Sequence, residues 1–153
     1  MREENNAFIS FGDTNEAGVI FDESNHAEYP LVYYNVINGQ GFEPTYDRSY
    51  YGYVYEGICN VNFIGRPPII LAEGMYFTSI GDFTFGAYST FKMILIEVLH
   101  KEGRYPETKF ASVYSSGGPI EPVGRLKYID GCTDSLLIPP VKMGDPCLNH
   151  LHF

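Results

Sequence analysis

Residues 42–99 consist of short apolar segments separated by Gly and Pro turns. Residues 50–56 predict one strand, which ends at Gly57, and residues 58–64 predict the next. Three further short strands are predicted before residue 99, at 69–71, 75–80 and 83–88. Short strands spaced about 8–12 residues apart are typical of an all-β sandwich or barrel, and this pattern restricts the chain to that class.

Strands are also predicted on both sides of this region. Residues 31–37 are rich in β-branched and aromatic side chains and end in an Asn-Gly turn. Residues 90–100 contain an apolar run without helical periodicity, which favours a strand buried on both faces. Residues 115–119 predict a linker, because they contain two Gly and a Pro. Three strands are expected beyond it, at 124–129, 135–138 and 148–153.

The strand at residues 50–56 carries a row of tyrosines on one face. Because side chains alternate along a strand, Tyr51, Tyr53 and Tyr55 share a face, and Tyr50, Gly52 and Val54 share the opposite one. We expect the second set to point into the barrel. The tyrosine row then needs cover, either from the N-terminal segment or from a second subunit, since aromatic side chains are enriched in interface cores.

Composition excludes several classes of function. The chain of 153 residues has a net charge of -9 and only 10 Lys and Arg, which argues against a nucleic-acid partner. Its three cysteines form no CxxC pair, so neither a disulfide framework nor a zinc site is suggested. Residues 1–6 lack the apolar core of a signal peptide, and the apolar run 93–99 is too short to span a bilayer. A cytoplasmic protein without a membrane partner is therefore expected.

The turns of residues 42–99 resemble the motifs of the cupin family, a double-stranded β-helix or jelly-roll barrel that often holds a metal. The first cupin motif ends in a Gly, matched here by Gly57, and counting back places Tyr50 at the family's Glu position. The positions of the paired histidines hold, in the two possible spacings, Pro44 and Tyr46 or Glu43 and Thr45. The turn of the second motif resembles Ala72-Glu73-Gly74, which places Phe77 at the His position and Gly81 at the Asn position.

None of the four metal ligands of that family is present, so the resemblance implies the fold without a metal or other cofactor. We expect an all-β, cupin-like jelly-roll barrel at residues 7–112, followed at 113–153 by a linker and a C-terminal arm of strands (residues 124–153). The arm resembles the first strands of a second cupin barrel, as in two-barrel proteins of the family. The alternative to a self-contained module is therefore the inactive half of a two-barrel metal-dependent enzyme, of dioxygenase or isomerase type.

Two groups of residues have spacings suited to chemistry. His150 and His152 share one face of a predicted strand, but a metal would need further ligands, such as Cys147, Asp145 or Glu97. The acidic pair Glu43 and Asp47 lies near the predicted barrel mouth and suits acid–base work or a hard cation. The alternative for the histidines is a terminal strand without a metal. The alternative for the acidic pair is a surface loop.

The leading functional prediction is a metal-free module that binds a small molecule or has a structural role. Its interior is predicted to be lined by Thr45, Tyr46, Tyr50 and Phe77, which suit a partly apolar or sugar-like ligand. A homodimer is also expected, formed through the C-terminal arm or through the Tyr51/Tyr53/Tyr55 face, because both surfaces are apolar and need a partner.

Overall fold

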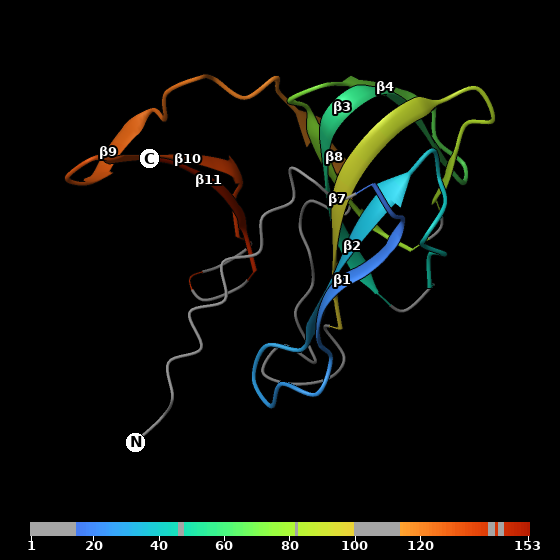
Figure 1. Ribbon diagram of the computed structural model, residues 1–153, viewed down its shortest axis with the longest axis horizontal. Helices are drawn as coiled ribbons and strands as arrows, with labels where there is room; N and C mark the ends of the chain where they lie inside the picture. Colours follow the sequence, from blue (N-terminus) through green and yellow to red (C-terminus); the bar gives the residue numbers. More distant parts are fainter. Residues whose placement is uncertain (1–14, 46–47, 82, 100–113, 141–142, 144–145) are drawn as a thin grey trace.

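A computed structural model describes residues 15–45, 48–81, 83–99, 114–140, 143 and 146–153. Within these residues every regular element is a β-strand, and all strand pairs are antiparallel (Figure 1). An eight-stranded sheet curves around one core and forms the barrel, and a three-stranded sheet forms the arm. The predicted all-β class with a C-terminal arm of strands is confirmed, and the two antiparallel sheets are consistent with the expected cupin-like jelly-roll barrel.

The order of strands in the barrel sheet is β1-β2-β7-β3-β5-β8, and β4 and β6 pair with the second half of β3. The barrel strands are β1 (Gly18–Glu23), β2 (Leu31–Ile37), β3 (Ser49–Phe63), β4 (Ile69–Ala72), β5 (Tyr76–Ile80), β6 (Phe83–Phe85), β7 (Thr90–Val98) and β8 (Tyr114–Gly117). The arm strands, in the order β11-β10-β9, are β9 (Leu126–Ile129), β10 (Cys132–Ile138) and β11 (Leu148–His152).

The prediction that a strand ends at Gly57 was wrong, because β3 runs without interruption from Ser49 to Phe63. Its pairing with β7 shifts by one residue between Val54 and Glu56, and Gly57 then adopts a φ of 83°. This bulge moves the buried side chains from even to odd positions: Tyr50, Gly52 and Val54 before it, and Cys59, Val61 and Phe63 after it. One bent strand therefore supplies the core with two stretches of side chains.

Strand β7 confirms the assignment of residues 90–98 to the sheet, and its neighbours β2 and β3 flank it on both sides. The interpretation of residues 115–119 as a linker was wrong for its first part, because residues 115–117 belong to β8 and pair with β5. Strand β1 was not predicted, since its sequence GVIFDE mixes apolar and acidic residues at the edge of the sheet. Edge strands tolerate such charge because one side faces solvent.

The barrel core is aromatic. Phe77 and Phe83 are fully buried, and their ring centroids lie 5.4 Å apart in an edge-to-face arrangement. Tyr50 packs edge-to-face against Phe83 at 5.5 Å, and Phe63 packs against Phe77 at 6.3 Å. Such offset contacts are the geometry that aromatic quadrupoles favour. The predicted inward orientation of Tyr50, Gly52 and Val54 is confirmed.

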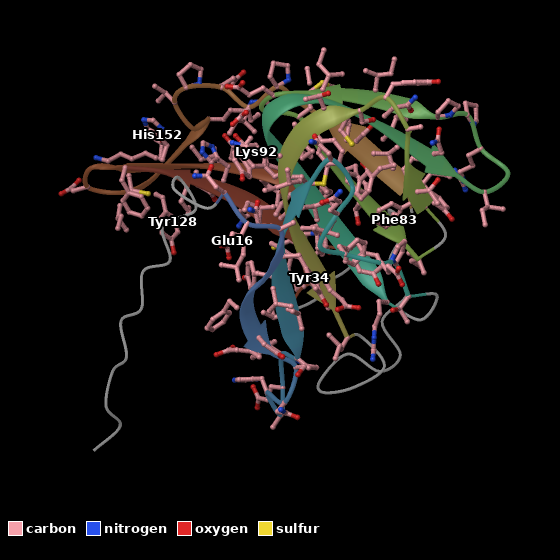
Figure 2. All side chains as sticks on the ribbon, turned by 45° about the vertical axis from the view of Figure 1, so that its right-hand side comes forward. Glu16, Tyr34, Phe83, Lys92, Tyr128 and His152 are labelled. Atoms are coloured by element: carbon pink, nitrogen blue, oxygen red, sulfur yellow. The ribbon has the colours of Figure 1, made fainter. Side chains whose placement is uncertain are left out.

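The outer face of β3 is covered from two directions. Tyr51 forms a second apolar cluster with Val98 of β7 and Ile138 of the arm, with Leu148 packed against it. Farther along, the Tyr55 hydroxyl donates a hydrogen bond to Asn35 Oδ1, and Asn35 Nδ2 donates to the carbonyl of Glu16. The arm thus covers Tyr51, and the segment before β1 reaches Asn35, the hydrogen-bond partner of Tyr55. Figure 2 marks the arm by its labelled residues Tyr128 and His152.

Candidate functional site

A polar cluster lies within the otherwise apolar interior, where β2, β3 and β7 run side by side. Tyr50 on β3 and Glu97 on β7 are directly opposite each other, and Tyr34 on β2 is paired with Leu95, two residues before Glu97. The Tyr34 hydroxyl donates a hydrogen bond of 2.7 Å to Glu97 Oε2. The Tyr50 hydroxyl donates one of 3.1 Å to Glu97 Oε1. The two phenols therefore hold one oxygen each of the same carboxylate.

The segment before β3 closes over this cluster. The backbone N–H of Thr45 donates a 2.8 Å hydrogen bond to the Tyr50 hydroxyl. The ring of Phe42 packs edge-to-face on both phenols, with centroid distances of 5.2 Å to Tyr34 and 5.1 Å to Tyr50. It also stacks on Phe83 at 6.0 Å, which joins the cluster to the aromatic core; Figure 2 labels Tyr34 and Phe83. Phe42 thus connects the polar cluster with the apolar interior.

Arg48 balances part of the carboxylate charge. Its Nε lies 3.8 Å from Glu97 Oε1, and the side chain of Arg48 is 23% exposed against 10% for Glu97. A carboxylate removed from water needs such compensation, because an isolated buried charge costs several kcal/mol. Two phenol donors and a nearby guanidinium supply it here. The arrangement places the carboxylate of Glu97 beneath the more exposed guanidinium of Arg48.

The surroundings raise the pKa of both phenols above its ordinary value. Burial is the main cause that raises the pKa of Tyr50 to about 12, and the charge of Glu97 raises it further, while the hydrogen bond from the Thr45 backbone opposes the change. Burial also raises the pKa of Tyr34, followed by its hydrogen bond to Glu97. Each phenol is therefore a hydrogen-bond donor to the carboxylate.

We expect this cluster to make the fold sensitive to alkaline pH. The unfolded chain loses the Tyr50 proton near 10.0, whereas the folded chain keeps it to about 12, so the free energy of unfolding is unaffected below pH 10 and falls between pH 10 and 12. Urea unfolding at pH 8, 10 and 11 measures this fall. The fall in the free energy of unfolding should be smaller in Tyr50→Phe and Tyr34→Phe than in the unchanged protein. It should be the same as in the unchanged protein in Tyr88→Phe, because the side chain of Tyr88 is fully exposed. Equal pH dependence in all four proteins would contradict the assignment.

The structure brings together some of the predicted site residues. Tyr50 and Phe77 are fully buried in the interior, and Thr45 is exposed at the rim, where it contacts Tyr50. Glu43 is exposed on the same segment, and Tyr46 and Asp47 lie outside the described residues. Tyr34, Arg48 and Glu97 were not predicted as interior residues. Glu97 carried a signal, because it is a charged residue that directly follows the apolar run 93–96 and shares the parity of Met93 and Leu95.

Among the described residues, no further ligand joins the histidine pair of the arm. His150 and His152 lie on one face of β11, with ring centroids 6.2 Å apart. In the described part of the chain, no three His, Cys, Asp or Glu side chains come together in a way that would hold a metal ion. Glu97, one of the suggested additional ligands, points into the barrel toward Tyr34 and Tyr50. Asp145 lies outside the described residues.

Comparisons with known proteins give few matches. No protein-family model matches the chain, and no curated protein does. One similar structure is an HTH_3 family transcriptional regulator from Vibrio cholerae, 15% identical, with a TM-score of 0.40 over 54% of this chain and 49% of the other. Another is the Clostridium difficile EutQ protein, 12% identical, with a TM-score of 0.41 over 61% of this chain and 66% of the other.

The match spans about half the length of the first of these proteins and about two thirds of the second. Likenesses this distant carry no argument about activity, and the fold class rests on the strand topology described above. Among the described residues, none forms a helix long and apolar enough to cross a membrane.

Proposed function

We propose that the chain is a small-molecule-binding module, with its site at the end of the barrel where Tyr34, Tyr50 and Glu97 meet. The observation that supports this is the carboxylate of Glu97. In the part of the chain that the structure describes, Glu97 is the one charged residue that is buried. A purely structural barrel gains little from burying a charge, since well-packed apolar residues usually serve stability as well or better. Buried polar groups in an apolar setting are instead typical of ligand sites, where they fix orientation.

The chemistry of the cluster favours a neutral ligand that carries hydroxyl groups. Carboxylate oxygens accept hydrogen bonds from ligand hydroxyls, and the guanidinium of Arg48 donates them. Phe42 and Tyr34 are half-buried, and the parts of their rings that stay exposed can pack on the apolar face of a sugar-like molecule. The exposed Thr45 and Glu43 add polar groups at the rim. A monosaccharide or a small polyol combines these requirements.

Titration of neutral monosaccharides and polyols, followed by ligand-detected NMR, tests this proposal. Tyr50→Phe should weaken binding by about 0.5–1.5 kcal/mol, the net contribution of one hydrogen bond. Tyr50→Ala should weaken it more, because the lost ring also opens a cavity beneath the site. Tyr53→Phe, on the opposite face of β3, is the matched control and should bind as the unchanged protein does. Equal affinities of all four proteins would place the ligand elsewhere.

We further propose that the barrel works without a metal or other cofactor. The positions of the cupin ligands hold Thr45, Tyr46, Tyr50 and Phe77, and a phenyl ring is no metal ligand. Of these, Tyr50 already uses its hydroxyl for Glu97 and the Thr45 backbone. The acidic residues Glu43 and Asp47 at the predicted mouth remain the candidates for a hard cation if the proposal fails.

A homodimer through the arm is a further part of this proposal. The arm covers Tyr51, and it presents exposed apolar side chains of its own, Leu126, Tyr128 and Ile129 on β9. Strand β9 lies at the edge of the arm sheet, and exposed apolar side chains on an edge strand favour association. Sedimentation velocity at micromolar concentration should show a dimer for the full chain and a monomer for the triple variant Leu126→Ser, Tyr128→Ser, Ile129→Ser. A monomeric full chain would refute it.

A further inference from the structure

A cleft of about 270 Å³ lies outside the barrel, between the outer face of its sheet and the arm. Strands β2, β3 and β7 form one wall, and the start of β11 forms the other. Its lining includes Leu31, Tyr33, Tyr51, Ile96, Val98 and Leu148. The cleft is therefore separate from the Glu97 cluster, which faces the interior of the same strands.

The cleft is continuous with the contact that holds the arm to the barrel. Tyr51, Val98, Ile96 and Leu148 belong both to its walls and to the apolar cluster formed with Ile138. The ring of Tyr33 packs edge-to-face on Phe21 of β1, with ring centroids 5.9 Å apart, and this contact supports its position in the cleft wall. Side-chain atoms that line an unfilled cleft lack dispersion contacts on the open side. A ligand that fills the cleft contacts both the barrel and the arm, so its binding stabilises the contact between them.

Volume and chemistry together define the ligand class. An apolar protein cavity of about 150 Å³ is large enough for benzene, so this cleft has room for two fused rings. None of the described residues that line it is charged, and three of them are tyrosines, whose rings suit stacking on a flat aromatic molecule. The net charge of -9 disfavours anions. A neutral two-ring aromatic fits each of these conditions.

We infer that this cleft binds one neutral two-ring aromatic molecule and that the bound molecule stabilises the docked position of the arm. By linkage, a ligand that binds the docked arm more tightly than the released arm shifts the equilibrium toward docking. The inference does not depend on the sugar-type site, because the two sites share strands but not side chains.

Titration with 1-naphthol tests the inference directly. The chain contains no Trp, so naphthol fluorescence can be followed without interference from indole emission. We expect saturable binding with a stoichiometry of one. Ile96→Phe fills the cleft and should weaken binding at least tenfold, whereas Ile94→Phe, on the same strand and face but outside the cleft, should change it less than twofold. The absence of saturable binding, or equal loss in both variants, would overturn the inference.

A second measurement keeps the test independent of how well Ile96→Phe folds. Cys147 lines the cleft and is exposed, whereas Cys59 and Cys132 are buried. Naphthol should therefore slow the reaction of Cys147 with a small disulfide reagent in the unchanged protein. Tyr50→Phe should bind naphthol normally, even if it loses the sugar-type ligand. Unprotected Cys147, or naphthol binding that depends on Tyr50, would place the aromatic in the barrel and refute the inference.

Discussion

Gly57→Ala is expected to destabilise the barrel by about 3 kcal/mol or more, a large share of the roughly 5–15 kcal/mol by which a domain of ordinary stability is folded. Gly57 has a φ of 83°, which costs an alanine about 1–2 kcal/mol. A Cβ at this position would also collide with the carbonyl oxygen of Thr90, which belongs to the neighbouring strand β7. Because that oxygen is backbone, relief requires separation of two paired strands. Urea unfolding followed by far-UV circular dichroism measures the loss.

Gly131→Ala is the matched control for this prediction. Gly131 has the same φ of 83°, but a Cβ there would have no atom within 4 Å. Its replacement should therefore cost only the conformational part, about 1–2 kcal/mol. The difference between the two variants isolates the contact between β3 and β7. Equal costs would show that the close approach at Thr90 contributes nothing.

Phe77→Ala is expected to cost about 3–5 kcal/mol, the usual range for loss of a fully buried phenyl ring. Phe77 lies opposite Gly52 on β3, and its ring occupies the space that a Cβ at Gly52 would need. It also contacts the rings of Phe63 and Phe83, so its removal leaves a cavity among rigid neighbours that cannot collapse easily. Thermal and urea unfolding should agree on the loss.

The control for Phe77→Ala is Tyr88→Ala, which removes an aromatic ring of similar size that is 101% exposed. Surface substitutions of this kind usually change stability by less than about 0.5 kcal/mol. A loss below about 1.5 kcal/mol for Phe77→Ala would mean that the interior is loosely packed around this ring, with room for a ligand there.

Local pattern predicted most of the strands, because alternation and turn residues act over a few positions. The inward side of residues 50–54 was predicted for this reason. The continuity of β3 was not, since Gly57 is equally suited to a turn and to a bulge, and only the pairing with β7 decides between them. Strand β8 was missed because its sequence YSSG has turn composition and becomes a strand through its pairing with β5.

The candidate site was predicted in part for a related reason. Tyr50 and Thr45 are five residues apart and were named together, and they do form a hydrogen bond. Tyr34 and Glu97 are separated by 63 positions, and their contact depends on the order β2-β7-β3 within the sheet. Short-range spacing carries no information on which strands become neighbours across the barrel. The position of Glu97 within β7 indicates that its side chain points inward. It does not indicate which hydroxyls donate hydrogen bonds to the carboxylate.

The attachment of the arm has a consequence for how two chains would exchange it. The N–H of Ile120 donates a hydrogen bond to the carbonyl of Gly74, which holds the connection close to the barrel just after β8. Only residues 121–125 then separate this anchor from β9. A short tether of this kind gives the arm an effective concentration on the order of millimolar near its own barrel. At micromolar protein, docking in the same chain therefore outcompetes exchange, and association between chains is left to the outward face of β9.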